Sequence, residues 1–129
     1  MKKILELAEF HHIGIPTTEV QSNEKYSKTF DLYTTKGHNP FRIQYHRFGE
    51  NSPFHPKIKT MTHVCFKVEN IEKHLKGQKI LMELYEPFKG YKAAMIEIEG
   101  APIELIETTL TEEEIWNDDK EGSYMYPAE

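Results

Sequence analysis

Apolar and polar residues alternate along most of this chain, which is the pattern of strands that bury one face of a sheet. The stretch "PFRIQYHRF" alternates most regularly, with the even positions from Arg42 to Phe48 on one face and the odd positions on the other. Pro16 ends an earlier strand, "HHIGIP", because proline has no N–H to donate to a sheet. In chain order we predict strands at HHIGIP, DLYTTKG, PFRIQYHRF, MTHVCFKV, QKILMELYEPF, YKAAMIEIEG and APIELIET.

Helix signals follow two of these strands. Thr17 or Thr18 provides an N-cap with acidic residues after it, which predicts a helix to about Phe30. "ENIEKHLKG" predicts a short helix that ends at Gly77, and "GENSPFHPKIKT" predicts a loop. In the acidic tail, "TEEEIW" predicts a helical turn, and we expect the rest to be peripheral, with the "EEE" and "DDKE" runs solvated.

The predicted elements occur twice in a similar order. "HHIGIPTTEVQSNEKYSK" and "THVCFKVENIEKHLKG" each run from a histidine through an apolar strand to a helix with an acidic start. A duplicated module is the simplest account of this internal similarity. With 129 residues the chain is expected to form one α+β domain with a core that needs no disulfide.

Composition and charge narrow the classes of partner. The net charge is −5, and the Lys and Arg residues are scattered, which argues against a nucleic-acid or anionic-membrane surface. The single Cys65 cannot form an intrachain disulfide and fits a reducing compartment. No apolar run approaches the roughly 20 residues that span a bilayer, and no leader is visible, so a cytoplasmic protein is expected.

Four polar residues occupy strand centres, where burial without a partner is costly. They are His12, Gln44, His63 and Glu104. Strand alternation places His12 opposite its neighbour His11, for which we therefore expect a solvated position. His12, Gln44, His63 and Glu104 each therefore need a polar partner elsewhere in the chain.

These segments together resemble the vicinal oxygen chelate superfamily, which includes glyoxalase I, methylmalonyl-CoA epimerase, extradiol dioxygenases and bleomycin resistance proteins. The resemblance rests on "HHIGIP", "THVCFKV" and "GAPIELIE", in this order and spacing, and covers residues from about 9 to 108. It implies two paired βαβββ modules, one over about 9–50 and one over about 60–108, followed by an acidic tail over 109–129. In that family the curled sheets enclose a cleft that holds a divalent metal.

The resemblance also implies a set of ligands. Matched position by position, the metal ligands are His12, Gln44, His63 and Glu104, a set closest to that of the epimerase branch. His46 shares a strand face with Gln44 and competes with it for the fourth place. The span from His12 to Gln44 is 32 positions and that from His63 to Glu104 is 41, so we expect an abbreviated first module with a missing or truncated strand, and a more open cleft.

The function implied is that of a metal-dependent isomerase, epimerase or lyase that acts on a small oxygenated substrate through a metal-stabilised enolate. The metal would be Zn, Co, Mn, Ni or Mg, and Glu104 would act both as a ligand and in catalysis. Arg42, Lys67 and His46 are the expected substrate-binding residues. A non-catalytic binder of the bleomycin-resistance type is the alternative, and an extradiol dioxygenase is a weaker one. Members of the superfamily often form homodimers, so a homodimer is also expected.

Overall fold

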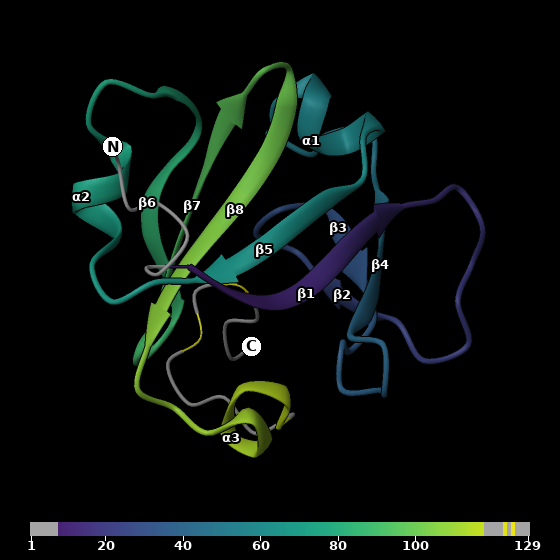
Figure 1. The fold of residues 1–129 in the computed structure, drawn as a ribbon. Coiled ribbons are helices and arrows are strands. Elements are labelled where there is room, and N and C mark those ends of the chain that lie inside the picture. The colour runs from purple at the N-terminus through teal and green to yellow at the C-terminus, as the bar shows by residue number, and fades with distance from the viewer. Residues whose placement is uncertain (1–7, 118–122, 124, 126–129) are drawn as a thin grey trace.

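In the part of the chain that the structure describes, eight strands form one mixed sheet that curls into a half-barrel, with three short helices around it (Figure 1). The computed structural model describes residues 8–117, 123 and 125. The strands are β1 (Glu9–Pro16), β2 (Lys25–Ser27), β3 (Leu32–Thr34), β4 (Ile43–Phe48), β5 (His63–Lys67), β6 (Lys79–Phe88), β7 (Tyr91–Ile98) and β8 (Ala101–Thr108). The helices are α1 (Pro56–Thr60), α2 (Ile71–Leu75) and α3 (Glu112–Trp116). The α+β class predicted from the sequence is confirmed.

Strand pairing gives the two halves of the chain a similar arrangement. The order across the sheet is β2-β3-β4-β1-β5-β8-β7-β6. The first strand of each half lies parallel to the last strand of that half, as β1 does to β4 and β5 to β8. The two first strands, β1 and β5, pair antiparallel in the middle of the sheet. His63, at the start of β5, lies opposite Gly14, so it is close to His12 in the middle of β1.

The helix predicted from Thr17 to about Phe30 is absent, and this expectation was wrong. The segment forms turns and then β2, which pairs with β3. Its apolar residues do not recur every three or four positions, so a helix here would have no apolar stripe to bury, and Val20 is exposed. The carboxylate of Glu24 instead accepts from the Gln21 amide and pairs with Arg47, which stabilises the turn.

The first half contains all four strands. It is shorter than the second half because it lacks a helix and because β2 and β3 have three residues each. The sequence predicts a missing or truncated strand in this half, and the short β2 and β3 agree with truncation. The segment predicted as a loop, over residues 49–60, contains the one-turn helix α1, which begins at Pro56, a favoured first helical residue.

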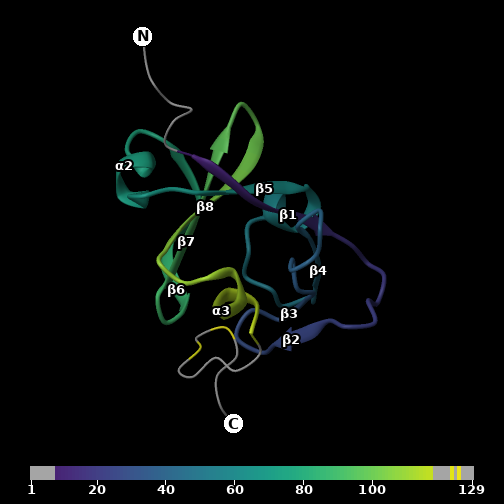
Figure 2. The same ribbon diagram turned by 60° about the horizontal axis from the view of Figure 1, so that its bottom comes forward.

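Helix α3 lies at the open side of the curled sheet, between the β6–β7 end and the β2–β3 end (Figure 2). Its start is a capping box: Thr111 Oγ1 accepts from the Glu114 amide at 3.2 Å, and the Glu114 carboxylate accepts from the Thr111 amide at 2.8 Å. Trp116 is buried in a core cluster with Tyr91 and Ile106. The predicted helical turn is thus confirmed, and it packs against the concave side of the sheet.

The helices of the described ranges are all too short to cross a membrane.

The core can be tested with two isoleucines from adjacent strands. Ile106 on β8 is fully buried, so Ile106→Ala should lower the free energy of unfolding by about 2–5 kcal/mol through lost burial and a new cavity. Ile98 on β7 is 37% exposed, and Ile98→Ala should cost about 1 kcal/mol or less. Urea unfolding of both variants measures the difference, and equal losses would contradict the assigned core.

Candidate metal centre

A β-bulge at the start of β1 turns two adjacent histidines into the interior. Phe10 lies opposite Phe66 and His12 lies opposite Cys65, so β1 has one more residue than β5 between these two pairs. The extra residue is His11, and strict alternation of faces is lost there. His11 and His12 are only 4% and 2% exposed. The expectation that His11 is solvated was wrong, because the bulge breaks the alternation on which it depended.

Three of the predicted ligands converge on the concave side of the sheet. Glu104 Oε1 on β8 lies 3.2 Å from His12 Nε2 on β1 and 3.1 Å from His63 Nε2 on β5. One ligand atom from each residue lies within 4.8 Å of the other two, which is close enough for one metal ion to contact all three. Because β1, β5 and β8 are consecutive in the sheet, the site stands on rigid, paired backbone.

The charge of this group suits a cation. Burial by itself would raise the pKa of Glu104, but hydrogen bonds with His12 and His63 and the attraction of these two rings hold it well below its usual range. Glu104 is therefore ionised. Burial raises the pKa of the neighbouring Cys65 thiol well above its usual value, so Cys65 is a neutral, buried side chain. The site combines one anionic oxygen with two imidazole nitrogens, a donor set typical of Zn²⁺ and similar ions.

Strand β4 carries Gln44 and His46, the two candidates for the fourth metal ligand. Gln44 lies opposite Gly14 in the sheet, just as Glu104 lies opposite Cys65, so Gln44 occupies in the first half the position of Glu104 in the second. His46 stacks on His63 with ring centroids 5.6 Å apart. Both residues line the same cavity as the three converging ligands.

The hydrogen bonds of Thr34 leave one nitrogen of His46 available. Thr34 Oγ1 accepts from Gln44 Nε2 at 3.2 Å and donates to the Thr35 carbonyl at 3.5 Å. His46 Nδ1 lies 3.0 Å from Thr34 Oγ1 and therefore donates to it, which leaves Nε2 with a lone pair. His46 Nε2 is buried and has no hydrogen-bond partner among the described residues. Burial and the adjacent His63 lower the pKa of His46 to about 3, so this ring is neutral.

Gly14 is required for these rings to meet. A Cβ on Gly14 would stand 2.5 Å from His63 Nε2 and 2.9 Å from His46 Nε2, closer than side chains can approach. The two nitrogens therefore point at the space that a larger residue would fill. The sequence analysis did not single out Gly14 as a requirement of the site.

The site forms one wall of a cavity of about 110 Å³. Most of the lining is apolar, and six aromatic side chains contribute to it: Phe48, Phe54, Tyr85, Phe88, Tyr91 and Trp116. No lysine or arginine is among the lining residues that the structure describes. The cavity therefore offers a polar, ligand-bearing wall and an apolar remainder.

The basic residues predicted to bind substrate lie elsewhere. Arg42 Nη1 forms an ion pair with Glu112 Oε1 at 2.5 Å. Lys67 lies at the far end of β5 opposite Glu9, and it lines a separate surface groove. Their role in substrate binding stays a prediction, and their positions give it no support in this cavity. His46, the third residue of that prediction, does line the cavity.

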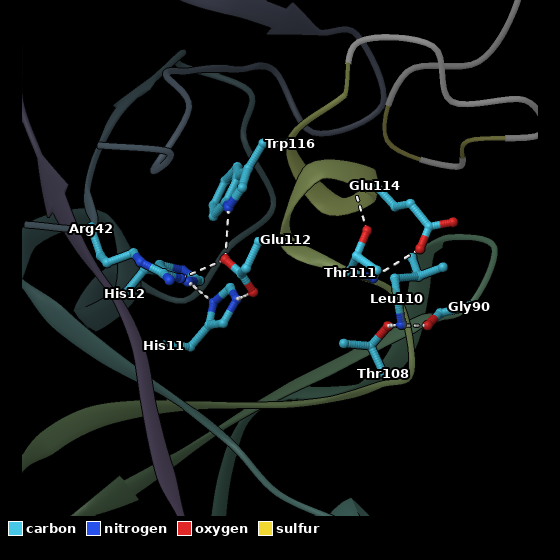
Figure 3. A network of polar contacts seen from close by, with 10 residues as sticks. All are labelled: His11, His12, Arg42, Gly90, Thr108, Leu110, Thr111, Glu112, Glu114 and Trp116. Atoms are coloured by element: carbon cyan, nitrogen blue, oxygen red, sulfur yellow. Dashed lines mark hydrogen bonds and ion pairs between the residues drawn. The ribbon is translucent and has the colours of Figure 1, made fainter. Parts of the chain in front are cut away.

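A network around Glu112 was missed by the sequence analysis, which assigned the "EEE" run to solvent. Glu112 contacts His11, Arg42 and Trp116, and its side chain is 34% exposed (Figure 3). Burial would raise the pKa of Glu112, but hydrogen bonds with His11 and Trp116 lower it below its usual value. Burial and the neighbouring His12 lower the pKa of His11, so His11 is the neutral partner of this pair. The capping signal located the helix, but no local pattern indicated which carboxylate turns inward.

Comparison with known proteins supports the fold and leaves the activity open. No model of a known protein family and no curated protein sequence matches the chain. Among solved structures it is similar to the hypothetical protein BH1468 from Bacillus halodurans C-125, with a TM-score of 0.60 and 16% identity over 81% of this chain and 96% of that one. At this identity the likeness is evidence for the fold alone.

Gly14→Ala tests the close approach of the two histidine rings. The added methyl group should displace His63 and His46, lower the free energy of unfolding by about 1–3 kcal/mol and weaken zinc binding. Gly100→Ala is the matched control, because Gly100 has a positive φ of 87° but no atom within 4 Å of its would-be Cβ. It should lose about 1–2 kcal/mol to backbone strain and keep its zinc affinity. Unchanged zinc binding by Gly14→Ala in calorimetry would contradict the described packing.

His46 should make the metal-free protein sensitive to acid. In the unfolded chain a histidine takes up a proton near its ordinary pKa of 6.5, whereas folded His46 resists protonation down to about pH 3. This residue's contribution to stability is therefore complete above pH 6.5 and falls by about 1.4 kcal/mol per pH unit towards pH 3. Urea unfolding in the presence of a chelator should show a weaker pH dependence for His46→Gln than for wild type. A change at the exposed His38, His38→Gln, serves as the control, and identical slopes for all three proteins would refute the assignment.

Proposed function

We propose that this chain is a divalent-metal-dependent isomerase, epimerase or lyase of the vicinal oxygen chelate type, acting on a small oxygenated substrate. In this proposal the two halves are paired modules, the first without its helix. Support comes from the parallel pairing of first and last strand in each half. Further support comes from the matching positions of Gln44 opposite Gly14 and Glu104 opposite Cys65.

The observation that carries the proposal is the convergence of His12, His63 and Glu104. The partnerless Nε2 of His46 beside them is a second indication, because a buried nitrogen with a free lone pair is costly unless a ligand or ion satisfies it. His12, His63 and Glu104 would hold the metal, with His46 or Gln44 as a fourth ligand. A nitrogen-rich set of this kind favours Zn, Co or Ni over Mg.

The bound ion would act as a Lewis acid that stabilises negative charge developing on a substrate oxygen. The chain itself supplies the proton acceptors. Glu104 is ionised, and His46 Nε2 carries a lone pair, so each is a candidate to take a proton from the carbon next to a carbonyl group. The mostly apolar lining would disfavour water near the metal, and this would strengthen the electrostatic interactions within the site.

The cavity also narrows the substrate. A volume of about 110 Å³ is somewhat smaller than the roughly 150 Å³ cavity that holds benzene, so only a small group enters. Because the described lining has no basic side chain, the metal would be the one positive charge available there, and an anionic group could be held inside only as a ligand of the metal. The part of the substrate that reaches the metal is therefore small and binds through its oxygen atoms, and any further charged part, such as that of a CoA thioester, would lie outside.

Two alternative functions are distinguished by the experiments described next. The aromatic lining would suit a non-catalytic binder of the bleomycin-resistance type, which needs no metal. Two histidines and one carboxylate are also the ligand set of non-haem iron oxygenases, which keeps the extradiol dioxygenase alternative in view.

Metal content and proton exchange test the proposal together. Protein purified without chelator should contain one divalent metal per chain, and His63→Ala and Glu104→Gln should lose it. The metal-loaded wild type should exchange carbon-bound protons of small α-hydroxy ketones, such as hydroxyacetone and acetoin, with solvent deuterium. His38→Ala, a change at an exposed loop histidine, should behave as wild type in both measurements.

The contrary results separate the alternatives. A protein without metal whose exchange rate equals that of His63→Ala would overturn the proposed function and favour the metal-free binder. Iron in the site with oxygen uptake on catechols would favour the dioxygenase.

A further inference from the structure

We propose that Glu112 and His11 are positioning residues for the metal ligand His12, and that they form a carboxylate–imidazole–imidazole relay that presents the lone pair of His12 Nε2 to the metal. The inference rests on the proposed function, since it assumes that a metal binds at His12, His63 and Glu104. It assigns a role to α3, which supplies Glu112 from outside the sheet (Figure 3).

Two short contacts define the relay. His11 Nε2 lies 2.8 Å from Glu112 Oε2, and His11 Nδ1 lies 2.7 Å from His12 Nδ1. His11 and His12 are almost fully buried, so water cannot replace either contact at these rings. The bulge in β1 makes the second contact feasible, because it turns both side chains to the same side of the strand.

The positions of the protons follow from the partners. An ionised carboxylate only accepts hydrogen bonds, so His11 Nε2 donates to Glu112. The 2.7 Å contact between the two Nδ1 atoms requires one proton between them, and in the relay this proton belongs to His12, so His11 Nδ1 accepts. His12 then carries a proton on Nδ1, so that Nε2 can present a lone pair to a metal.

The lone pair of His12 Nε2 points at the metal centre. Nε2 lies 3.2 Å from the ionised Oε1 of Glu104. Two such atoms at this separation need a proton or a cation between them, and the hydrogen bond with Glu104 uses a proton. A metal would take the place of that proton, while the relay keeps the other proton of His12 on Nδ1. The relay therefore favours the state of His12 that binds a metal, as a carboxylate does when it orients a metal-bound histidine directly.

Glu112 is itself held in place. Its Oε1 accepts from Arg42 Nη1 at 2.5 Å and from Trp116 Nε1 at 3.1 Å, which leaves Oε2 for His11. Arg42 has a φ of 56°, which is unusual for a residue with a side chain. Asn39 Oδ1 stabilises this turn by accepting from the amides of Phe41 and Ile43. Backbone strain at Arg42 thus accompanies the ion pair that fixes the carboxylate.

The same side chains could be taken for a second metal site, since His11, His12 and Cys65 also form a compact group. The contact between the two Nδ1 atoms argues against it. A separation of 2.7 Å is that of a hydrogen bond and is short for two ligands of one tetrahedral ion. The buried Cys65 thiol is also neutral, whereas a metal needs the thiolate.

The test compares two glutamates of α3. Glu112→Gln weakens the first bond of the relay, and Glu114→Gln removes the same charge from the same helix turn while preserving the capping box, which glutamine can also form. Co²⁺ and Zn²⁺ affinities are measured for both variants and for wild type by competition with a chromophoric chelator. His11→Phe, which removes the middle of the relay, and His63→Ala, which removes a ligand, are included. Thermal unfolding of the metal-free proteins checks that each variant folds.

Glu112→Gln and His11→Phe should bind metal about 10- to 100-fold more weakly than wild type, and Glu114→Gln should bind as wild type. Long-range ¹H–¹⁵N NMR of the zinc-loaded wild type should show His12 protonated at Nδ1 and His11 at Nε2. Glu114→Gln should keep this pattern, and Glu112→Gln should show His11 in mixed tautomers. A purely structural role of Glu112 would not change the tautomers. If His11→Phe does not fold, Glu112→Gln decides the outcome.

Several results would overturn the relay. Wild-type affinity in Glu112→Gln would do so, and so would equal weakening in Glu112→Gln and Glu114→Gln, which would indicate a general effect of charge. Two metals bound per chain would favour the second metal site. If wild type binds no metal, or if His63→Ala binds as tightly as wild type, the proposed metal centre itself fails and the relay fails with it.

Discussion

The burial of the Glu104 carboxylate at the centre of the sheet is the constraint on which the rest of the site depends. An ionised carboxylate in such a position is stable only with close, well-oriented partners. His12 and His63 provide them from the two adjacent strands, each about 3 Å from the same oxygen atom. The strand order, the parallel pairing of β5 with β8 and the bulge in β1 all contribute to this one meeting of side chains.

The curl of the sheet places the buried Glu104 carboxylate beside a cavity. Because the half-barrel is open on one side, the ligand-bearing strands form the wall of a cavity (Figure 1). Helix α3 lies at that opening and contributes Trp116 to the lining and Glu112 to the network around His11. The same short helix therefore contributes to the apolar lining and to the network beside the polar centre, and it is stabilised by its own capping box.

The first half of the chain is the less regular of the two. It has shorter strands, no helix and an arginine with a positive φ, while the second half has long strands and the core residue Ile106. The first half nevertheless supplies His12, His46 and Gln44 to the cavity. The second half supplies His63 and Glu104, so both halves contribute polar groups to the site.

The sequence by itself determined most strands, α3 and the α+β class, because alternation and capping residues are local signals. The meeting of His12, His63 and Glu104 was predicted only through the resemblance to vicinal oxygen chelate proteins, since local patterns showed polar residues in need of partners but not which partners they have. Three features were decided only by the tertiary structure. The segment over 17–30 has a good N-cap but no apolar stripe, so pairing with β3 replaced the predicted helix. The bulge that buries His11 adds one residue opposite β5 and leaves no mark in composition. Glu112 became the partner of His11 from 101 residues away, a distance over which no sequence period can choose one carboxylate from a run of three.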